Sequence, residues 1–211
     1  MTPRPARLVF VAGTGTAVGK TWTAAAVLAR LRTAGLRVGA RKPAQSFDAA
    51  DGPTDADVLA RATGEPPHDI CPPHRWYSRA LAPPMAADAL GAPPFTVGDL
   101  VGELRWPDGI DVGLVEGAGG PRSPIAADGD NAALASAVAP DLVLLVAEAG
   151  LGAINAVRMS VDAFAGAPVV VVLNAYDEDD VVHHENRDWL RDRDGYDVVT
   201  GPDTAVARIV P

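Results

Sequence analysis

Short apolar runs alternate along the chain with stretches in which apolar residues recur every three or four positions. Several runs, such as LVLLVA and VVVVL, are continuous rather than alternating, which is typical of strands covered on both faces. Strands are predicted at 8–12, 36–40, 112–115, 142–147, 169–173 and 198–199. Helices are predicted at 19–34, 55–63, 96–105, 129–138, 152–165 and 179–193.

This alternation predicts an α/β fold, with a doubly wound, mostly parallel sheet and helices on both faces. We expect residues 1–211 to form a single P-loop α/β domain. Ligands on such sheets bind beyond the carboxyl ends of the strands, so functional residues should directly follow strands. The segments 47–53 and 66–94, rich in proline and glycine, are expected to form long connections near the substrate, and only a short tail is expected after Val199.

The first predicted strand leads into a glycine-rich loop that ends in Gly19-Lys20-Thr21, the close of a P-loop. Backbone N–H groups at the start of a helix attract phosphate oxygens, while the lysine reaches the terminal phosphates and the hydroxyl can ligate Mg²⁺. The common spacing places a glycine at position 14, but this chain has Thr14 there and Gly13 before it. A plain strand–turn–helix junction with a solvated lysine is the alternative. The hydrophobic strand and amphipathic helix around the loop favour phosphate binding.

Polar residues follow the other predicted strands. Lys42 could hold a phosphate or an anionic intermediate, although taken alone it is better explained as a solvated lysine. Asp55 could ligate a metal, but a plain helix N-cap at Thr54 or Asp55 is the better interpretation in isolation. Glu116, at a strand end before several glycines, is placed like a Walker-B-type Mg²⁺ ligand. The turn at 148–155 is either an anion site or an ordinary helix start, and Asn174 either binds a base or forms a turn.

Composition narrows the possible partners. The net charge of −9, from 18 basic and 27 acidic residues, argues against a nucleic-acid partner. A single cysteine, Cys71, excludes an internal disulfide and fits a reducing compartment. No long apolar segment precedes the P-loop, and the run at 142–147 is far shorter than a membrane span. We therefore expect a cytoplasmic protein with no membrane partner.

Taken in order, several motifs resemble the dethiobiotin synthetase family over roughly residues 1–175. They are GTGTAVGKT (13–21), RKPAQS (41–46), TDADVL (54–59), APPMAA (82–87), VEGAGG (115–120), LGAIN (151–155) and Asn174. The P-loop with one extra residue is itself characteristic of that family. The resemblance implies a ligase of biotin biosynthesis that uses ATP and Mg²⁺ to close a ureido ring on 7,8-diaminononanoate. One amine forms a carbamate with CO₂, the carbamate takes the γ-phosphoryl group to give a carbamic-phosphoric anhydride, and the second amine displaces phosphate.

The resemblance also implies roles by position. Catalytic roles fall to Lys42, Lys20 and Thr16, and Mg²⁺ ligation to Thr21, Asp55 and Glu116. The implied nucleotide-binding residues are Gly13, Thr14, Ala17, Val18, Gly19, Lys20, Thr21, Trp22, Glu116, Gly117, Ala118, Gly119, Asn174, Pro202 and Asp203. The implied substrate contacts are Ser46 and, from a neighbouring subunit, Gly150, Leu151, Gly152 and Asn155. A homodimer with its active site at the interface follows.

The chain departs from the family pattern at Gly15, Ala17, Phe47 and Ala156, and its C-terminus is shorter than usual. These departures concern substrate identity and base selectivity more than fold or ATP use. They leave open a paralogue that binds nucleotide but uses another substrate or is inactive. A cobyrinic-acid-type amide synthetase is disfavoured, since it would need a glutaminase domain with a nucleophilic cysteine. The other alternative is a regulatory or partitioning ATPase. The P-loop of such ATPases usually carries a lysine early in the loop, and positions 13–18 contain none, which argues against this alternative.

Overall fold

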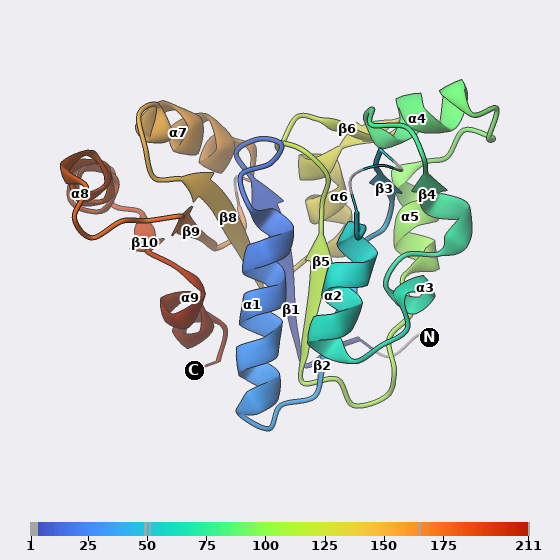
Figure 1. Ribbon diagram of the computed structural model, residues 1–211, viewed down its shortest axis with the longest axis horizontal. Coiled ribbons are helices and arrows are strands. Elements are labelled where there is room, and N and C mark those ends of the chain that lie inside the picture. The colour runs from blue at the N-terminus through green and yellow to red at the C-terminus, as the bar shows by residue number, and fades with distance from the viewer. Residues whose placement is uncertain (1–3, 49, 51, 165, 211) are drawn as a thin grey trace.

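A six-stranded parallel sheet forms the centre of the computed structural model, which describes residues 4–48, 50, 52–164 and 166–210. Its strand order is β10-β9-β8-β1-β5-β2. The strands are β1 (Arg7–Gly13), β2 (Val38–Arg41), β5 (Val112–Glu116), β8 (Leu142–Glu148), β9 (Val169–Asn174) and β10 (Asp197–Val199). All six predicted strands are present, with ends shifted by one or two residues, and the parallel α/β fold is confirmed (Figure 1).

Helices cover both faces of this sheet (Figure 1). The predicted ones are confirmed as α1 (Lys20–Thr33), α2 (Asp55–Thr63), α5 (Val97–Glu103), α6 (Asn131–Val138), α7 (Ala153–Ala163) and α8 (Val181–Asp188). The last continues into a π-helical turn, η2 (Trp189–Arg193). The predicted end of α7 at residue 165 lies outside the described residues. Within the described ranges, no helix is both long enough and apolar enough to cross a bilayer.

Alternate residues of β1 belong to two separate hydrophobic clusters, one on each face of the sheet. Val9 and Val11 pack with residues of α1 and α2, whereas Leu8 and Phe10 pack with residues of α6 and α7. Every second side chain of a strand points to the opposite face, so both sets must be apolar when both faces are covered. This burial explains why the strands appear in the sequence as continuous apolar runs.

Several elements were not expected from the sequence. They are α3 (Pro67–Ile70), η1 (Pro73–Arg75), α4 (Pro83–Ala89), α9 (Pro202–Ile209) and two small strand pairs, β3 (Gln45–Ser46) with β4 (Trp76–Tyr77) and β6 (Pro124–Ala126) with β7 (Gly129–Asp130). The expectation of long connections over 66–94 and of a plain C-terminal tail was therefore wrong. Each of these helical segments has proline in its first turn, where the missing N–H costs nothing.

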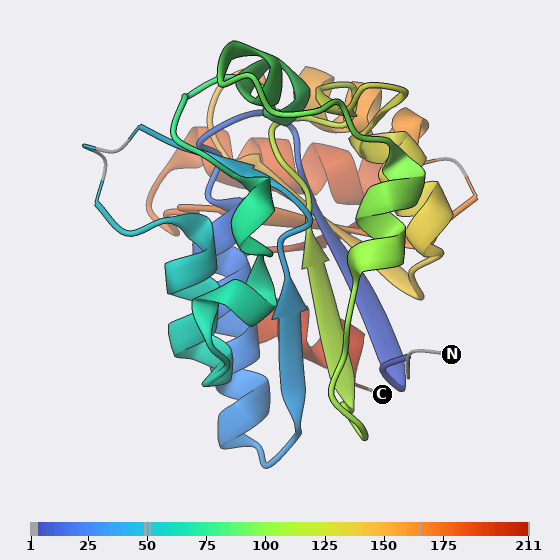
Figure 2. The same ribbon diagram turned by 90° about the vertical axis from the view of Figure 1, so that its right-hand side faces the viewer.

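An ion pair between Arg75 and Glu103 links the proline-rich segment 66–94 to α5. Arg75 Nη2 lies 2.7 Å from Glu103 Oε1, and the Arg75 guanidinium stacks 4.3 Å from the centre of the Phe95 ring. Burial raises the pKa of Glu103, but hydrogen bonds from Arg75 and His74 outweigh that effect and leave the pKa below its usual value. The segment that follows Arg75 leads to β4 and α4 at the carboxyl edge of the sheet (Figure 2).

The substitution Glu103→Gln should lower the free energy of unfolding by about 1–2 kcal/mol at pH 7, since hydrogen bonds to a charged group are lost. The folded-state pKa of Glu103 lies below the unfolded one. The stabilisation is therefore present above the unfolded pKa and is lost as the pH falls through the folded value. Denaturant titrations at pH 7 and at lower pH should show the two proteins converging. Glu185→Gln, exposed on α8, is the control and should match the wild type.

Candidate active site

The loop between β1 and α1 forms a cradle of unpaired backbone donors. The backbone N–H groups from Gly15 to Trp22 donate no hydrogen bond to any described residue, whereas those of Thr14 and Thr23 are paired. Positive φ angles at Ala17 (61°) and Gly19 (92°) turn the chain sharply within this loop. Consecutive free donors at the start of a helix, where the helix dipole is positive, are suited to phosphate oxygens.

Gly13 and Gly19 occupy positions in this loop where neighbouring side chains leave no room for a Cβ atom. A Cβ atom on Gly13 would lie 2.8 Å from Val18 Cγ2, and one on Gly19 would lie 2.0 Å from Asn174 Nδ2. That amide donates a 3.1 Å hydrogen bond to the carbonyl of Val18. Asn174 thus supports the loop from behind, a contact that the sequence did not predict. Its proposed contact with a nucleotide base remains a prediction.

Beside the cradle, Lys42 lies between two carboxylates. Its Nζ atom is 2.7 Å from Glu116 Oε1, 2.7 Å from Asp55 Oδ2 and 2.9 Å from the carbonyl of Gly117. Strand pairing brings these groups together, because β2 and β5 are neighbours with Arg41 opposite Val115, so that Lys42 and Glu116 both follow this pair. The interpretation of Lys42 as a solvated lysine was wrong, since its side chain is 2% exposed.

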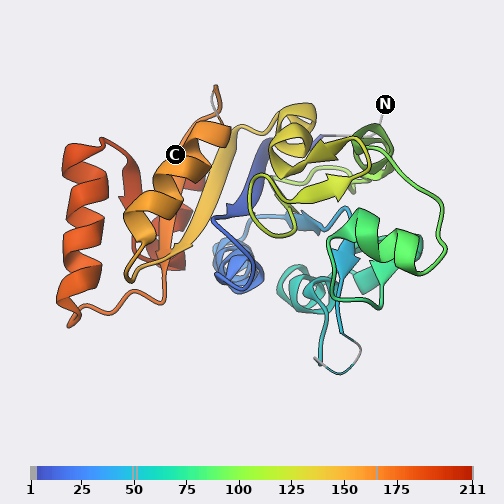
Figure 3. The ribbon, with the colours of Figure 1, turned by 90° about the horizontal axis from the view of Figure 1, so that it is seen from above.

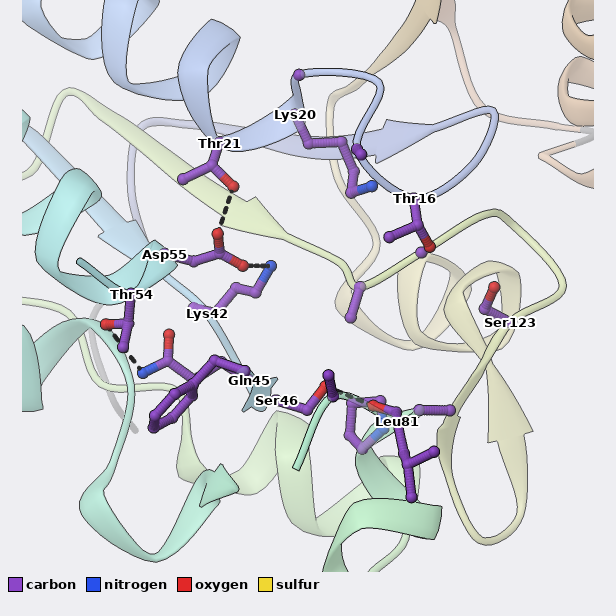
Figure 4. Close-up of a pocket in the computed structure, with 18 of the residues that line it drawn as sticks. Thr16, Lys20, Thr21, Lys42, Gln45, Ser46, Thr54, Asp55, Leu81 and Ser123 are labelled. Carbon is purple, nitrogen blue, oxygen red and sulfur yellow. Dashed lines mark hydrogen bonds and ion pairs between the residues drawn. The ribbon is translucent and has the colours of Figure 1, made fainter. Parts of the chain in front are cut away.

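The Thr21 hydroxyl joins the same group. Its Oγ1 atom lies 2.8 Å from Asp55 Oδ1 and 2.8 Å from Glu116 Oε1 (Figure 4 shows the contact with Asp55). Asp55 is the first residue of α2, and Thr54 caps that helix through its side chain, so the N-cap role expected for this segment belongs to the threonine. The carboxylate of Asp55 is thereby left to face Thr21 and Lys42.

The charges of this cluster depend on one another. Burial lowers the pKa of Lys42, but the carboxylates of Asp55 and Glu116 outweigh it, and the pKa is raised. The Lys42 charge lowers the pKa of Asp55, whereas complete burial raises the pKa of Glu116. Burial and repulsion from Lys42 lower the pKa of Lys20 to about 8. Both ammonium groups therefore carry positive charge near neutral pH, which favours an anionic ligand.

The residues present fit a magnesium ion. The donors would be oxygens of Thr21, Asp55 and Glu116, and Mg²⁺ prefers such hard ligands together with water and phosphate oxygens. Glu116 is fully buried, and its Oε2 atom has no hydrogen-bond partner among the described residues. No cluster of three or more His, Cys, Asp or Glu side chains suited to a metal occurs in the described ranges, so phosphate oxygens and water would have to complete the shell.

Most of these groups line one cavity of about 610 Å³ (Figure 4). The cavity lies at the carboxyl ends of the strands, the edge of the sheet that Figure 3 views from above. The predicted residues that line it are Thr16, Ala17, Gly19, Lys20, Thr21, Trp22, Lys42, Ser46, Asp55, Ala118 and Gly119. The lining residues for which no ligand contact was predicted include Gln45, Thr54, Ala80, Leu81, Pro83 and Ser123. Gln45 and Pro83 lie within quoted motifs and could have been included. Ser123 carried no sequence signal.

Other predicted residues do not line the cavity. Glu116 lies beneath it, bound to Thr21 and Lys42, and Gly13, Thr14, Val18 and Gly117 shape its loops. Gly150, Leu151 and Gly152 lie in the β8–α7 turn, where Leu151 is 92% exposed, and Asn155 lies in the first turn of α7. Pro202 and Asp203 begin α9, and the Asp203 carboxylate pairs with Arg30 of α1. The predicted ligand contacts of these residues remain predictions.

Solved structures support the fold. The signal recognition particle receptor FtsY from Elizabethkingia anophelis is 18% identical with a TM-score of 0.54, over 94% of this chain and 58% of that one. A duf1611 family protein from Anabaena variabilis is 18% identical with a TM-score of 0.57, over 97% of this chain and 57% of that one. The chain spans under three fifths of these two structures, and at this identity the similarity establishes fold alone.

Sequence relatives establish the family. A family model described as an AAA domain matches residues 7–201. The ATP-dependent dethiobiotin synthetase BioD of Anaeromyxobacter dehalogenans (strain 2CP-C) is 40% identical over 174 residues, 80% of this chain and 76% of that protein. The protein of the same name from Rhodococcus jostii (strain RHA1) is 35% identical over 91% of this chain and 84% of its own length. The chain therefore belongs to the dethiobiotin synthetase family.

Proposed function

We propose that this protein catalyses the ATP-dependent closure of the ureido ring of dethiobiotin, from 7,8-diaminononanoate and CO₂, in biotin biosynthesis. One observation carries the proposal. One cavity combines unpaired amide donors of the P-loop, Lys20, Lys42 and the Asp55 carboxylate, with the buried Glu116 carboxylate bound to Lys42 beside it. The names of the relatives support the same activity, and the family resemblance supplies the course of the reaction.

The chemistry requires several anions to be brought together. A carbamate and a triphosphate repel one another, and fixed positive charges lower the cost of their approach. Lys20 and Lys42 would supply these charges, and Thr16 would contact a phosphate or the carbamate from the loop. The reaction needs no nucleophile from the protein, because the substrate amine and the carbamate oxygen form the new bonds. Positioning is therefore the main contribution of the chain.

We assign the phosphates of ATP to the free N–H groups of the P-loop and Mg²⁺ to Thr21, Asp55 and Glu116. When bound, Mg²⁺ neutralises charge that develops on phosphate oxygens. Lys42 holds Asp55 and Glu116 in place through its ammonium group and offsets part of their negative charge. Following the family resemblance, Asn174 is assigned to the nucleotide base, together with Pro202 and Asp203 at the start of α9.

The other end of the cavity suits an alkyl chain. Phe47, Leu81 and Pro83 contribute apolar surface there, and Ser46 is assigned to the diamine. Following the family resemblance, we assign the substrate carboxylate to residues 150–155 of a second copy; Leu151, Gly152 and Asn155 are exposed, and none of the six residues lines the cavity of its own chain. The active protein would be a homodimer with its site at the interface. The lone, buried Cys71 fits the proposed cytoplasmic location.

The decisive test is to incubate the protein with ATP, Mg²⁺, bicarbonate and 7,8-diaminononanoate and to detect dethiobiotin by mass spectrometry. We expect dethiobiotin, ADP and phosphate in equal amounts, and none of the three without the diamine. Lys20→Ala is the matched control and should be inactive. ATP binding without dethiobiotin would instead favour the paralogue with another substrate, or an inactive one.

A further inference from the structure

Asn131, the first residue of α6, is buried and bonded entirely to the loop that follows β5. Its side chain is 2% exposed. The Nδ2 group donates to the carbonyls of Ala118 (2.6 Å), Gly120 (2.9 Å) and Ser123 (3.2 Å), and Oδ1 accepts from the N–H of Ala118 (3.0 Å). One carboxamide therefore fixes both ends of residues 118–123.

The loop is shaped to fit this side chain. A Cβ atom on Gly117 would lie 2.4 Å from Asn131 Oδ1, so only glycine allows the backbone to come this close. Gly119 adopts a positive φ of 75°, and the N–H of Gly120 donates to Ser123 Oγ at 2.9 Å. The loop conformation thus depends on Asn131 and on a turn closed by Ser123.

This conformation leaves one backbone donor free beside the P-loop. The N–H groups of Gly117, Ala118 and Gly120 are all paired, whereas that of Gly119 has no acceptor among the described residues. Gly119 lines the cavity, and a Cβ atom built on it would lie 2.6 Å from Ser123 Oγ and 3.7 Å from Thr16 Oγ1, so Gly119 lies between the turn closed by Ser123 and the P-loop.

Asn131 also fixes the direction of three backbone carbonyl groups of the loop. Its amide engages the carbonyl oxygens of Ala118, Gly120 and Ser123, which would repel an anion if they turned into the cavity. Asn131 itself does not line the cavity and touches no ligand position. Its influence on an anion must therefore act through the loop.

We propose that Asn131 is a positioning residue that holds the loop 118–123 so that the Gly119 N–H completes the anion site opposite the P-loop. The inference rests on the proposed function, because it takes the anion to be the phosphoryl group in transfer from ATP to the carbamate. Ser123 assists by closing the turn through its hydroxyl. The P-loop donors do not depend on Asn131 and are expected to bind ATP without it.

The test compares Asn131→Ala with Leu134→Ala. Leu134 is a buried residue of the same helix; its side chain does not line the cavity and makes no hydrogen bond to the loop. Misplacing a catalytic group by about 1 Å can cost on the order of 100-fold in rate, so we expect kcat of Asn131→Ala to fall by about that factor. The Kd for ATP should change less than about threefold, since the phosphate cradle is separate. Folded Leu134→Ala should retain kcat. An equal loss of kcat in both variants, or none in Asn131→Ala, would overturn the inference.

Hydrogen exchange supplies a readout that does not require dethiobiotin synthesis. A nonhydrolysable ATP analogue should slow exchange at Gly119 in the wild type, and this protection should disappear in Asn131→Ala while protection over 15–22 persists. If the wild type makes no dethiobiotin but this pattern holds, the proposed function fails and the positioning role stands. Protection at Gly119 that survives in Asn131→Ala would refute the role. If Asn131→Ala does not fold, Gly117→Ala, whose Cβ would displace the Asn131 carboxamide, serves in both assays.

Discussion

Replacing Lys42 with alanine is expected to lower dethiobiotin synthesis by about 100- to 1,000-fold, the loss typical when one preorganised charge stabiliser is removed. The Kd for ATP should change by less than about fivefold, because the free N–H groups of the P-loop and Lys20 remain. The result would be a variant that binds nucleotide but does not close the ring. Steady-state kinetics and calorimetric titration with an ATP analogue measure the two quantities.

Stability must be controlled in this experiment. Removing one partner of a buried ion pair can cost about 3–5 kcal/mol, and Glu116 would be left fully buried without its nearest positive charge. Because burial already raises the pKa of Glu116, we expect this carboxyl group to take up a proton in the variant. Lys42→Met, which keeps the length of the side chain, separates packing from charge. Turnover within tenfold of the wild type by folded Lys42→Met would contradict the role of Lys42.

The sheet could be predicted from the sequence because burial on both faces leaves a strong local signal. Residues 142–147 and 169–173 are apolar at every position, and both became central strands. The C-terminal helix α9 gave a weaker signal. Only Pro202, Ala205 and Ile209 of its eight residues are buried, and its first residue is a proline. Its place against α1 is set by tertiary contacts, including the pair between Arg30 and Asp203, which no local pattern reveals.

The site could be predicted only one residue at a time. Lys42 follows β2, Asp55 begins α2 and Glu116 ends β5, and for the first two an ordinary structural role was at least as plausible. Their meeting depends on β2 pairing with β5, a contact between segments more than 70 residues apart in sequence. Asn131 gave no signal, because it lies within the helix predicted at 129–138 and belongs to none of the motifs. Here Asp130 caps the helix, and Asn131 is free to bind the glycine loop.

The substitution Glu116→Gln should raise the Mg²⁺ concentration needed for half-maximal activity by at least about tenfold, because a charged oxygen ligand is replaced by a neutral amide. Glu116 is fully buried, its Oε1 contacts Thr21 and Lys42, and its Oε2 has no partner among the described residues. The NH₂ group of the glutamine side chain would also face the Lys42 ammonium group or the proposed metal. It would be repelled there, because an NH₂ group is a hydrogen-bond donor and cannot ligate a cation. Calorimetry of an ATP analogue at several Mg²⁺ concentrations should show the same shift without turnover.

Glu65→Gln is the matched control, because Glu65 is also a largely buried carboxylate, paired at 2.8 Å with Arg41 beside Lys42. It lies outside the cavity, so its loss should lower stability and leave the Mg²⁺ dependence unchanged. The comparison separates a ligand from a structural charge. If both variants shift the Mg²⁺ requirement equally, the shift comes from a disturbance of the ends of β2 and β5, and the assignment of Glu116 as a ligand is contradicted. If Glu116→Gln shifts nothing, Glu116 serves only to hold Lys42, and the metal must be bound elsewhere along the phosphates.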